Sequence, residues 1–212
     1  MNLDALRQAL AELHLDGWLL YDFHGQNPTA LHVLGLGGRM LTRRFFLLLP
    51  RQGEPVLLAH AIEQSQFGPD VPGRRERYAS WQSLRDGLAR MLGALPAGAR
   101  LAMEYIPGGT IPTLSRVDAG TLELVRSFGV EVVSSADLVQ RFFCRLDAAQ
   151  VESHRRALAA IDAAKDAAFE RIGAAHRRGE TPLETEIQAF LMERFREANL
   201  ETDHAPIVAE LR

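Results

Sequence analysis

Hydrophobic residues follow two different spacings over the first 146 positions of the chain. Leucines at helical spacing predict a first helix, which Asn2 caps and which ends near Gly17. Short apolar runs bounded by glycine, proline or charged residues predict strands over residues 18–21, 44–50, 55–59, 101–105 and 130–133. The second and third runs flank a turn that contains Gly53, which predicts an antiparallel hairpin. Strands that alternate with helices indicate an α/β fold, and the hairpin makes its sheet mixed.

Further helices are predicted between these strands. Asn27 caps a short helix that has Pro28 at its first position, and Ser80 caps a longer one. Another helix is expected over residues 114–128, where the apolar spacing is again helical. Gly35, Gly37 and Gly38 predict a mobile loop that needs unusual backbone angles. The segment 66–77, with two glycines, two prolines and three arginines, is expected to be an exposed loop.

The composition changes at Asp147, after which alanine, glutamate and arginine dominate. Asp147 and Gln150 have the spacing of a capping box, which predicts a long helix that runs to about Arg178. Thr181 is placed to cap a second helix, and residues 202–209 are interpreted as the start of a strand. We therefore expect two domains, a complete one and an unfinished one, over residues 1–146 and 147–212.

The composition excludes some classes of partner. The chain has 212 residues, of which 47% are hydrophobic, enough for one core and part of a second. A net charge of −3 gives no general attraction to nucleic acid or to acidic membranes, so neither is expected as a partner. The single Cys144 has no internal disulfide partner, and its apolar neighbours predict a buried, unreactive thiol. The N-terminus lacks the charged-then-apolar order of a signal peptide, which favours a cytoplasmic protein.

The residues that carry chemistry are scattered along the chain. None of the seven histidines has a second histidine within three to five residues, so no helix-borne metal site is predicted. Asp22 and His24 follow a predicted strand and are the most suggestive pair, although structural roles are commoner for such residues. Ser134 and Ser135 are placed to cap a helix rather than to act as nucleophiles. Two arginine clusters are solvated faces or contacts across a dimer: 43–44 and 74–77.

Several segments carry a resemblance to a known family, most specifically the run VEVVSSADLVQ over residues 130–140. The others are LDGWLLY, the Asn27 helix with its final LG, GEPVL, MEYIPGG, SRVDAG, GETPLETE and APIVA. Together they cover nearly the whole chain, which resembles the prolidase and aminopeptidase P family of metallopeptidases. The resemblance implies a creatinase-like N-terminal domain, with a mixed sheet and flanking helices, over residues 1–146. It implies that residues 147–212 form the first two helices and the first strand of an incomplete pita-bread domain.

The resemblance also implies a function. In that family two divalent metal ions (Mn, Co or Zn), held by two Asp, a His and two Glu, activate water for attack on the bond before proline. Those ligands are expected to follow the end of this chain, so we expect no catalytic residue, no metal ligand and no cofactor in it. The implied assembly is a homodimer in which this domain restricts the partner's active site to short proline-containing peptides. The candidate substrate-binding residues are Arg44, Arg43 and Tyr105, because they would hold a peptide carboxylate by charge-assisted hydrogen bonds.

Two other interpretations remain open. The chain is alternatively a free-standing peptide-binding or regulatory module without peptidase activity, or part of a creatinase-like enzyme that acts on a small guanidino compound. The sequence does not distinguish an expressed fragment, a proteolytic product and a shortened reading frame, so whether the chain is itself an enzyme stays open. The two helices between residues 147 and 199 carry apolar faces, which predicts exposed hydrophobic surface or oligomers that cover it.

Overall fold

The computed structural model describes residues 2–209 and divides the chain into two compact units. Unit 1 spans Met1–Cys144 and unit 2 spans Arg145–Arg212, so the division falls close to the change of composition at Asp147. Within the described part of the chain, no helix combines the length and the apolar character that a membrane span requires.

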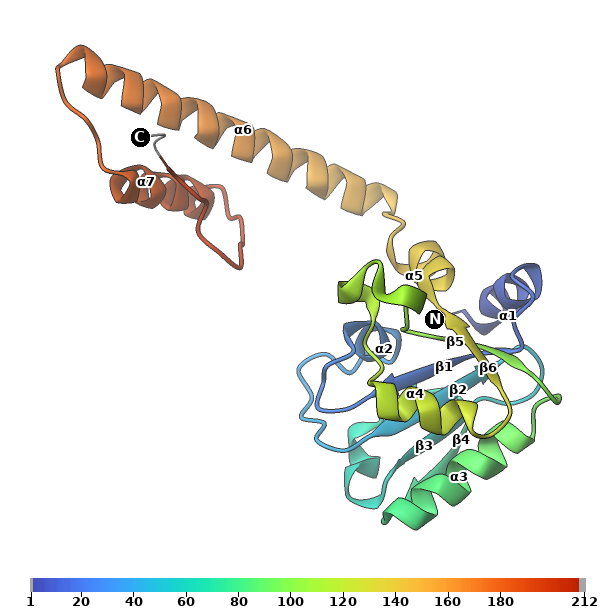
Figure 1. The fold of residues 1–212 in the computed structure, drawn as a ribbon. Helices are drawn as coiled ribbons and strands as arrows, with labels where there is room; N and C mark the ends of the chain where they lie inside the picture. Colours follow the sequence, from blue (N-terminus) through green and yellow to red (C-terminus); the bar gives the residue numbers. More distant parts are fainter. Residues whose placement is uncertain (1, 210–212) are drawn as a thin grey trace. The chain divides into compact units, whose positions relative to one another are not determined.

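Unit 1 is built around one six-stranded sheet with the strand order β4-β3-β2-β1-β5-β6 (Figure 1). The strands span Gly17–Asp22 (β1), Phe45–Pro50 (β2), Val56–His60 (β3), Arg74–Tyr78 (β4), Arg100–Met103 (β5) and Glu131–Ser134 (β6). Strand β2 pairs antiparallel with both of its neighbours, whereas every other pairing is parallel. The predicted mixed sheet and the hairpin of β2 and β3 are therefore confirmed. Because only β2 is reversed, its amino end lies at the same edge as the carboxyl ends of the other five strands.

Helices cover both faces of this sheet, as the expected fold class requires (Figure 1). The helices α3 (Trp81–Gly93) and α4 (Ala119–Arg126) pack on one face, and α1 (Leu3–Glu12), α2 (Pro28–Val33) and α5 (Ala136–Phe143) pack on the other. Short 3₁₀ turns occupy the connections Ala61–Gln66 (η1), Pro107–Gly109 (η2) and Pro112–Leu114 (η3). The predicted caps Asn2, Asn27 and Ser80 each accept a hydrogen bond from a backbone amide in the first helical turn.

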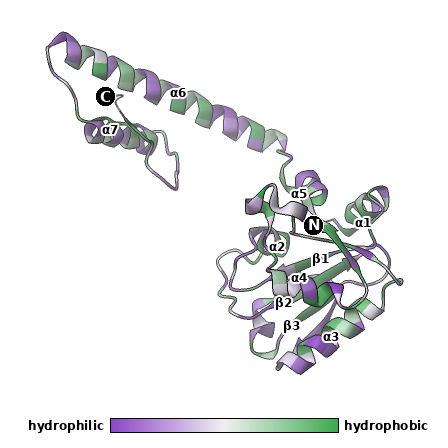
Figure 2. Cartoon of the chain, in the orientation of Figure 1, coloured by the Kyte–Doolittle hydropathy of each residue, from purple (hydrophilic) through white to green (hydrophobic). Residues whose placement is uncertain are grey.

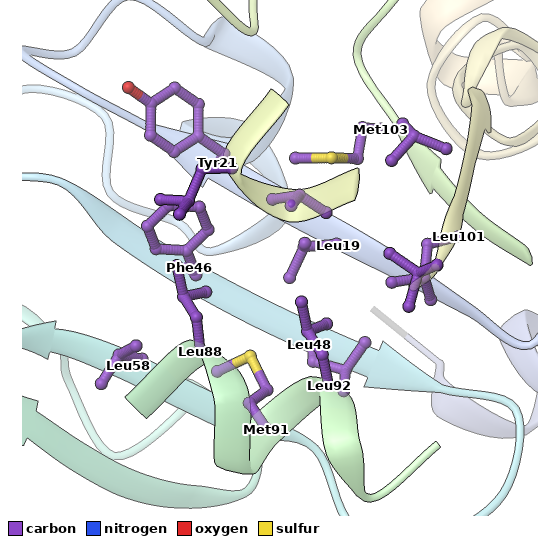
Figure 3. Close-up of a cluster of buried hydrophobic side chains, with 14 of the residues drawn as sticks. Leu19, Tyr21, Phe46, Leu48, Leu58, Leu88, Met91, Leu92, Leu101 and Met103 are labelled. Atoms are coloured by element: carbon purple, nitrogen blue, oxygen red, sulfur yellow. The ribbon is translucent and has the colours of Figure 1, made fainter. Parts of the chain in front are cut away.

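Successive residues of the central strands point to opposite faces and so supply two separate cores. Leu19 and Tyr21 of β1 belong to the core beneath α3 and α4, where Leu88 and other side chains of α3 meet the sheet (Figure 3). Trp18 and Leu20 of the same strand belong to the core on the other face. Strand β1 is buried over its whole length, and Figure 2 shows β2 and β3 as hydrophobic strands. Burial on both faces explains why these strands are continuous apolar runs in the sequence.

Two glycines permit close approach of neighbouring elements. A Cβ atom on Gly87 of α3 would lie 2.7 Å from Leu58 Cδ1 of β3, so glycine lets the helix pack close to the sheet. Gly73, directly before β4, has φ +88°, and a Cβ atom there would lie 2.0 Å from the carbonyl oxygen of Pro55. The Arg74 amide donates a 3.0 Å hydrogen bond to that same oxygen, so Gly73 allows β4 to begin against β3.

Two predicted boundaries in unit 1 are wrong. Residues 74–78 form the edge strand β4 instead of belonging to a loop, because β3 supplies their pairing partners and an edge strand tolerates charged side chains. Helix α4 begins at Ala119 instead of residue 114. It begins there because the Asp118 carboxylate caps it by accepting a hydrogen bond from the Thr121 amide.

The region around α5 also differs from expectation. The Ser135 hydroxyl does not cap the helix, since it donates to the buried Glu104 carboxylate, while Ser134 Oγ accepts from the Ala136 amide. Cys144 is exposed and not buried, because it follows the last residue of α5 at the end of unit 1.

Unit 2 consists of the long helix α6 (Ala148–Arg177) and the shorter α7 (Glu184–Glu197), which pack against each other. Asp147 and Gln150 form the predicted capping box at the start of α6. Ala164, Ala168 and Ala175 of α6 are buried, as is Ile187 of α7. Small residues on the long helix therefore allow the two helices to approach closely.

Two expectations for unit 2 are not met. The residue before α7 is Leu183 rather than Thr181, and its amide donates to the Glu186 carboxylate. Residues 202–209 form no strand in the described part of the chain, and the Pro206 carbonyl instead accepts a 2.9 Å hydrogen bond from the Gln188 side chain. The segment is therefore irregular here, without a strand to pair with it.

Candidate functional site

A pocket of about 560 Å³ opens at the edge of the sheet where the parallel strands end. Tyr21, His60 and Tyr78 line it from the ends of β1, β3 and β4. Arg43 and Arg44 line it from the segment before β2, whose reversed direction brings its amino end to this edge. Ligands of open α/β sheets bind beyond the carboxyl ends of the strands, so this pocket is the candidate functional site.

A buried carboxylate fixes the backbone that carries the two arginines. Glu63 of η1 is 8% exposed, and its carboxylate accepts hydrogen bonds from the Thr42 amide at 2.7 Å and the Thr42 hydroxyl at 2.8 Å. It also accepts a 3.2 Å hydrogen bond from the Arg43 amide. The Tyr78 hydroxyl donates a 2.7 Å hydrogen bond to the Arg44 carbonyl, and burial raises the pKa of Tyr78 to about 12. Glu63 and Tyr78 thus both hold the backbone of residues 42–44, without any ligand on the two arginine side chains.

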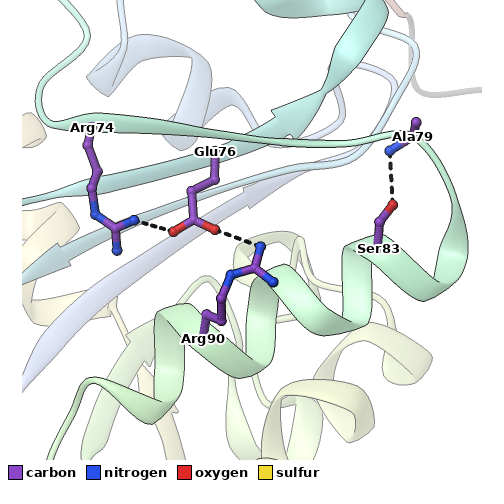
Figure 4. Close-up of polar contacts among 5 residues, drawn as sticks. All are labelled: Arg74, Glu76, Ala79, Ser83 and Arg90. Carbon is purple, nitrogen blue, oxygen red and sulfur yellow. Dashed lines mark hydrogen bonds and ion pairs between the residues drawn. The ribbon is translucent and has the colours of Figure 1, made fainter.

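The Arg44 guanidinium lies over the indole ring of Trp81, 5.1 Å from the ring centroid to the guanidinium carbon. This is the geometry of a cation–π contact, and it orients the guanidinium of Arg44, which lines the pocket. Trp81 is the first residue of α3, and two hydrogen bonds fix the start of this helix. The Ser80 hydroxyl accepts from the Ser83 amide, and the Ser83 hydroxyl accepts from the Ala79 amide at 3.0 Å (Figure 4).

An ion-pair bridge connects β4 with α3 outside the pocket. The Glu76 carboxylate of β4 accepts from Arg74 on the same strand and, at 3.1 Å, from Arg90 of α3 (Figure 4). The two arginines share one carboxylate and do not line the pocket. They support the framework that holds Trp81 in place.

Tyr21 and Asp118 form another wall of the pocket. The Tyr21 hydroxyl donates to Asp118 Oδ2 at 2.8 Å, and the Thr121 amide donates to Oδ1 at 2.8 Å. Burial by itself would raise the pKa of Asp118, but hydrogen bonds from Thr121 and Tyr21 outweigh it and hold that pKa below its usual value. Burial, followed by the bond to Asp118, raises the pKa of Tyr21. At neutral pH this wall therefore presents a neutral phenol beside an ionised carboxylate.

The structure brings together some of the predicted site residues and separates one of them. Arg43 and Arg44 line the same pocket, whereas Tyr105 follows β5 and lines a different hollow. The Tyr105 ring lies beneath the guanidinium of Arg126, at 5.1 Å. Arg116 is the residue that borders both hollows.

Of the residues that line the pocket, sequence reasoning singled out only Arg43 and Arg44 as candidate site residues, and it missed His60, Arg116 and Asp118 among others. His60 stands alone at the end of β3, and Arg116 and Asp118 lie in the segment SRVDAG, which is notable in the sequence for a family resemblance and not for a site. The one available signal was the spacing of Asp118 and Thr121, which is that of a helix cap and its partner amide. That signal places the start of α4, and hence the position of Asp118.

The pair Asp22 and His24 has a structural role. Asp22 is fully buried, and its carboxylate accepts from the amides of Gly25 at 2.9 Å and Asn27 at 2.8 Å. His24 has φ +59°, and its ring meets the Phe23 ring edge-on. The carboxylate therefore tightens the turn after β1 and does not face a ligand pocket.

A second buried carboxylate joins strands β1 and β5 to the start of α5. Glu104 is 3% exposed and accepts hydrogen bonds from Trp18 Nε1 at 2.7 Å, Asn27 Nδ2 at 2.7 Å and Ser135 Oγ at 2.9 Å. Burial raises the pKa of Glu104, and these three bonds oppose that effect. Because every donor points at this one carboxylate, the cluster fixes the ends of elements that are distant in the sequence.

The described residues do not fit the metal centre that the family resemblance implies. Among residues 2–209, no group of three or more His, Cys, Asp or Glu side chains is arranged to hold a metal ion. Asp118 is the only acidic residue that lines the described pocket, and one carboxylate with three arginines is a poor environment for a cation.

Comparison with solved structures identifies the fold. The chain is similar to dipeptidase PepE from Mycobacterium ulcerans, with 20% identity and a TM-score of 0.58 over 92% of this chain and 48% of that one. It is similar to a prolidase from Thermococcus sibiricus, with 12% identity and a TM-score of 0.56 over 92% of this chain and 48% of that one. The chain is also similar to an X-Pro aminopeptidase from Thermotoga maritima, with 16% identity and a TM-score of 0.50 over 93% of this chain and 49% of that one.

The sequence resembles prolidases and aminopeptidases, and these solved structures confirm that the chain shares their fold. The chain spans about half the length of each of these proteins. No protein-family model and no curated protein matches the sequence itself.

Proposed function

We propose that this chain is the N-terminal, non-catalytic part of an Xaa-Pro peptidase, a metal-dependent hydrolase that cleaves the bond before proline in short peptides. The observation that carries the proposal is the fold, which extends over 92% of the chain in its likeness to a dipeptidase and a prolidase. The sequence segments that resemble this family lie in both units, which supports the same assignment.

Catalysis would belong to residues outside this chain. A hydrolase of this type holds its metal ions with several converging carboxylates and an imidazole, and residues 2–209 contain no such group. We propose that the 212-residue chain by itself binds no catalytic metal and hydrolyses no peptide.

The role that we assign to unit 1 is to pair with a second copy in a homodimer and to narrow the entrance to the partner's active site. Arg44, assisted by Arg43, would hold the carboxylate of a short peptide by charge-assisted hydrogen bonds. The fixed backbone and the Trp81 contact support this role, since a preorganised guanidinium loses less entropy on binding. Tyr105 lies apart from both arginines and has no part in this proposal. A cytoplasmic location would suit the composition.

The test combines two measurements on the protein made from its natural gene: intact mass, and hydrolysis of an Xaa-Pro dipeptide in added Mn²⁺. A longer natural product that hydrolyses the dipeptide, beside an inactive 212-residue chain, is the expected result. Turnover by a chain whose mass ends at Arg212 would contradict the assignment of catalysis to other residues. A longer product without turnover would remove the peptidase assignment.

One observation favours a second candidate function, a free-standing peptide-binding or regulatory module. The pocket with Arg43 and Arg44 is formed by unit 1 alone, so binding there needs no second domain. Metal-independent binding of an Xaa-Pro dipeptide to a natural product that ends at Arg212 would support this module over the peptidase.

A further inference from the structure

The residues that line the pocket of unit 1 carry an excess of positive charge. Among the described residues, the guanidinium groups of Arg43, Arg44 and Arg116 make no ion pair with a carboxylate, although all three line the pocket. Elsewhere on the surface, Arg51, Arg90 and Arg141 are paired with Asp16, Glu76 and Glu12. Unpaired arginines gathered in one hollow are the usual feature of an anion site.

The one acidic group of the pocket does not cancel this charge. Asp118 is engaged by the Tyr21 hydroxyl and the Thr121 amide, one on each carboxylate oxygen. Among the residues that line the pocket, three guanidinium groups against one carboxylate leave an excess of two positive charges. A ligand with two negative charges would balance that excess.

The shape and rigidity of the pocket also suit a small ligand. Its volume of about 560 Å³ lies within the range of small-molecule sites, and Tyr21, Tyr78 and Trp81 supply apolar walls. Arg44 uses the face of its guanidinium on Trp81, which leaves the N–H groups at its edge free to donate. The Glu63 and Tyr78 hydrogen bonds fix the backbone of residues 42–44, so a ligand does not have to order this backbone when it binds.

We propose that this pocket is a metal-independent binding site for a small organic dianion, a dicarboxylate or a phosphate monoester, held by Arg43, Arg44 and Arg116. The site belongs to unit 1 alone and goes beyond the proposed peptidase function, because neither a metal nor a second domain takes part in it.

Tryptophan fluorescence reports on this site directly. The chain has two tryptophans: Trp18 is fully buried, and Trp81 is 47% exposed beside Arg44. The full chain is titrated with succinate and with inorganic phosphate in the presence of EDTA, and acetate serves as the single-charge control. We expect saturable binding of at least one dianion, about tenfold tighter than acetate, and weaker binding as salt is added. The fluorescence change should vanish in Trp81→Phe.

Matched substitutions test the residues. Arg44→Ala and Arg116→Ala should each weaken dianion binding about tenfold, because each removes a charged hydrogen-bond donor. Arg85→Ala, which removes the same charge from an exposed position of α3 outside the pocket, should leave affinity unchanged. Asp118→Asn should tighten binding, since it removes the negative charge and keeps a residue that caps α4.

Three outcomes would overturn the proposal: no saturable binding of either dianion, equal losses in Arg44→Ala and Arg85→Ala, or binding that requires a divalent metal. The two probes distinguish the two kinds of ligand. Tighter binding of succinate would identify a dicarboxylate, with planar carboxylate groups, and tighter binding of phosphate would identify a tetrahedral phosphate group. The result is independent of the peptidase assay. Dianion binding by this chain, together with a longer natural product that hydrolyses no Xaa-Pro dipeptide, would leave this site standing and remove only the proposed function.

Discussion

The hydroxyl of Tyr78, at the end of β4, donates a 2.7 Å hydrogen bond to the backbone carbonyl of Arg44, just before β2. Strand β3 lies between these two strands, so the bond crosses a neighbour at the carboxyl edge of the sheet. It connects the edge strand directly to the arginine segment of the pocket. The position of Arg44 therefore depends on a strand with which its own strand does not pair.

Replacing Tyr78 by Phe should separate this bond from the packing of the ring. We expect the free energy of unfolding to fall by about 1 kcal/mol, because the Arg44 carbonyl loses a partly buried donor. Chemical denaturation of Tyr78→Phe beside the unchanged protein measures the loss. An equal stability of the two proteins would show that water replaces the hydroxyl without cost.

Alkaline pH should weaken the same connection. The Tyr78 pKa is raised from 10.0 to about 12, chiefly by burial, so the folded protein holds this proton more tightly than the unfolded chain. The stability from this difference is complete below pH 10 and is lost as pH rises through about 12. Urea denaturation between these values should show the decline, and Tyr78→Phe should show less of it. An identical decline in both proteins would assign the effect to other groups.

Gly73 and Gly53 form a matched pair of positions. Both have positive φ, +88° and +97°, but a Cβ atom on Gly73 would lie 2.0 Å from the Pro55 carbonyl oxygen, whereas Gly53 has open space. Gly53→Ala should cost about 1 kcal/mol of stability from backbone strain alone. Gly73→Ala should cost clearly more, because β4 must move away from β3. Thermal unfolding compares them, and equal losses would mean that β4 yields without cost.

Glu104 and Glu54 allow a test of the buried polar cluster. Glu104→Gln places an amide N–H₂ group, itself a donor, among three donors. The Asn27 side-chain amide cannot flip to offer its oxygen instead without losing the hydrogen bond from its Nδ2 to the Tyr21 carbonyl. We expect a loss of about 1–3 kcal/mol in the free energy of unfolding. Glu54→Gln, at an exposed position, should change it by less than about 0.5 kcal/mol. Similar values for both variants would show that Glu104 is held as a neutral acid that donates a hydrogen bond.

Unit 2 should associate through α6. Phe169 is 67% exposed, and the exposed Leu158 and Ile161 lie at helical spacings that place them on the same side of the helix. Sedimentation velocity should show association that rises with concentration and is weakened by Phe169→Lys. Glu170→Lys, which introduces the same side chain one position further on, is the control. Unchanged association in both variants would place the contact elsewhere.

Local signals in the sequence predict local structure well. The caps at Asn2, Asn27, Ser80 and Asp147 act on amides within three residues, so neighbouring residues suffice to predict them. The buried strands are equally clear, since both of their faces must be apolar. The sequence therefore predicts the mixed α/β sheet.

Features that depend on distant partners are not predictable in this way. The charged residues of β4 form a strand only because β3 offers its unpaired edge, and glycines and prolines before it suggest a loop. The pocket has the same origin. Arg43 and Arg44 are visible as a cluster, but Arg116 and Asp118 join them only because the sheet brings the ends of its strands to one edge.

The pairing of β1 has a consequence for synthesis of the chain from its amino end. Strand β1 pairs with β2 on one side and with β5 on the other, and the Trp18 indole donates to Glu104, which is 86 positions later. The meander of β1, β2 and β3 is complete in sequence by His60, well before β5 leaves the ribosome. Until then β1, whose residues are all buried in the folded protein, has one edge without a partner strand, and the Trp18 indole has no acceptor. The nascent chain thus passes through a stage in which it is prone to aggregate, and the emergence of residues 100–104 from the ribosome ends that stage.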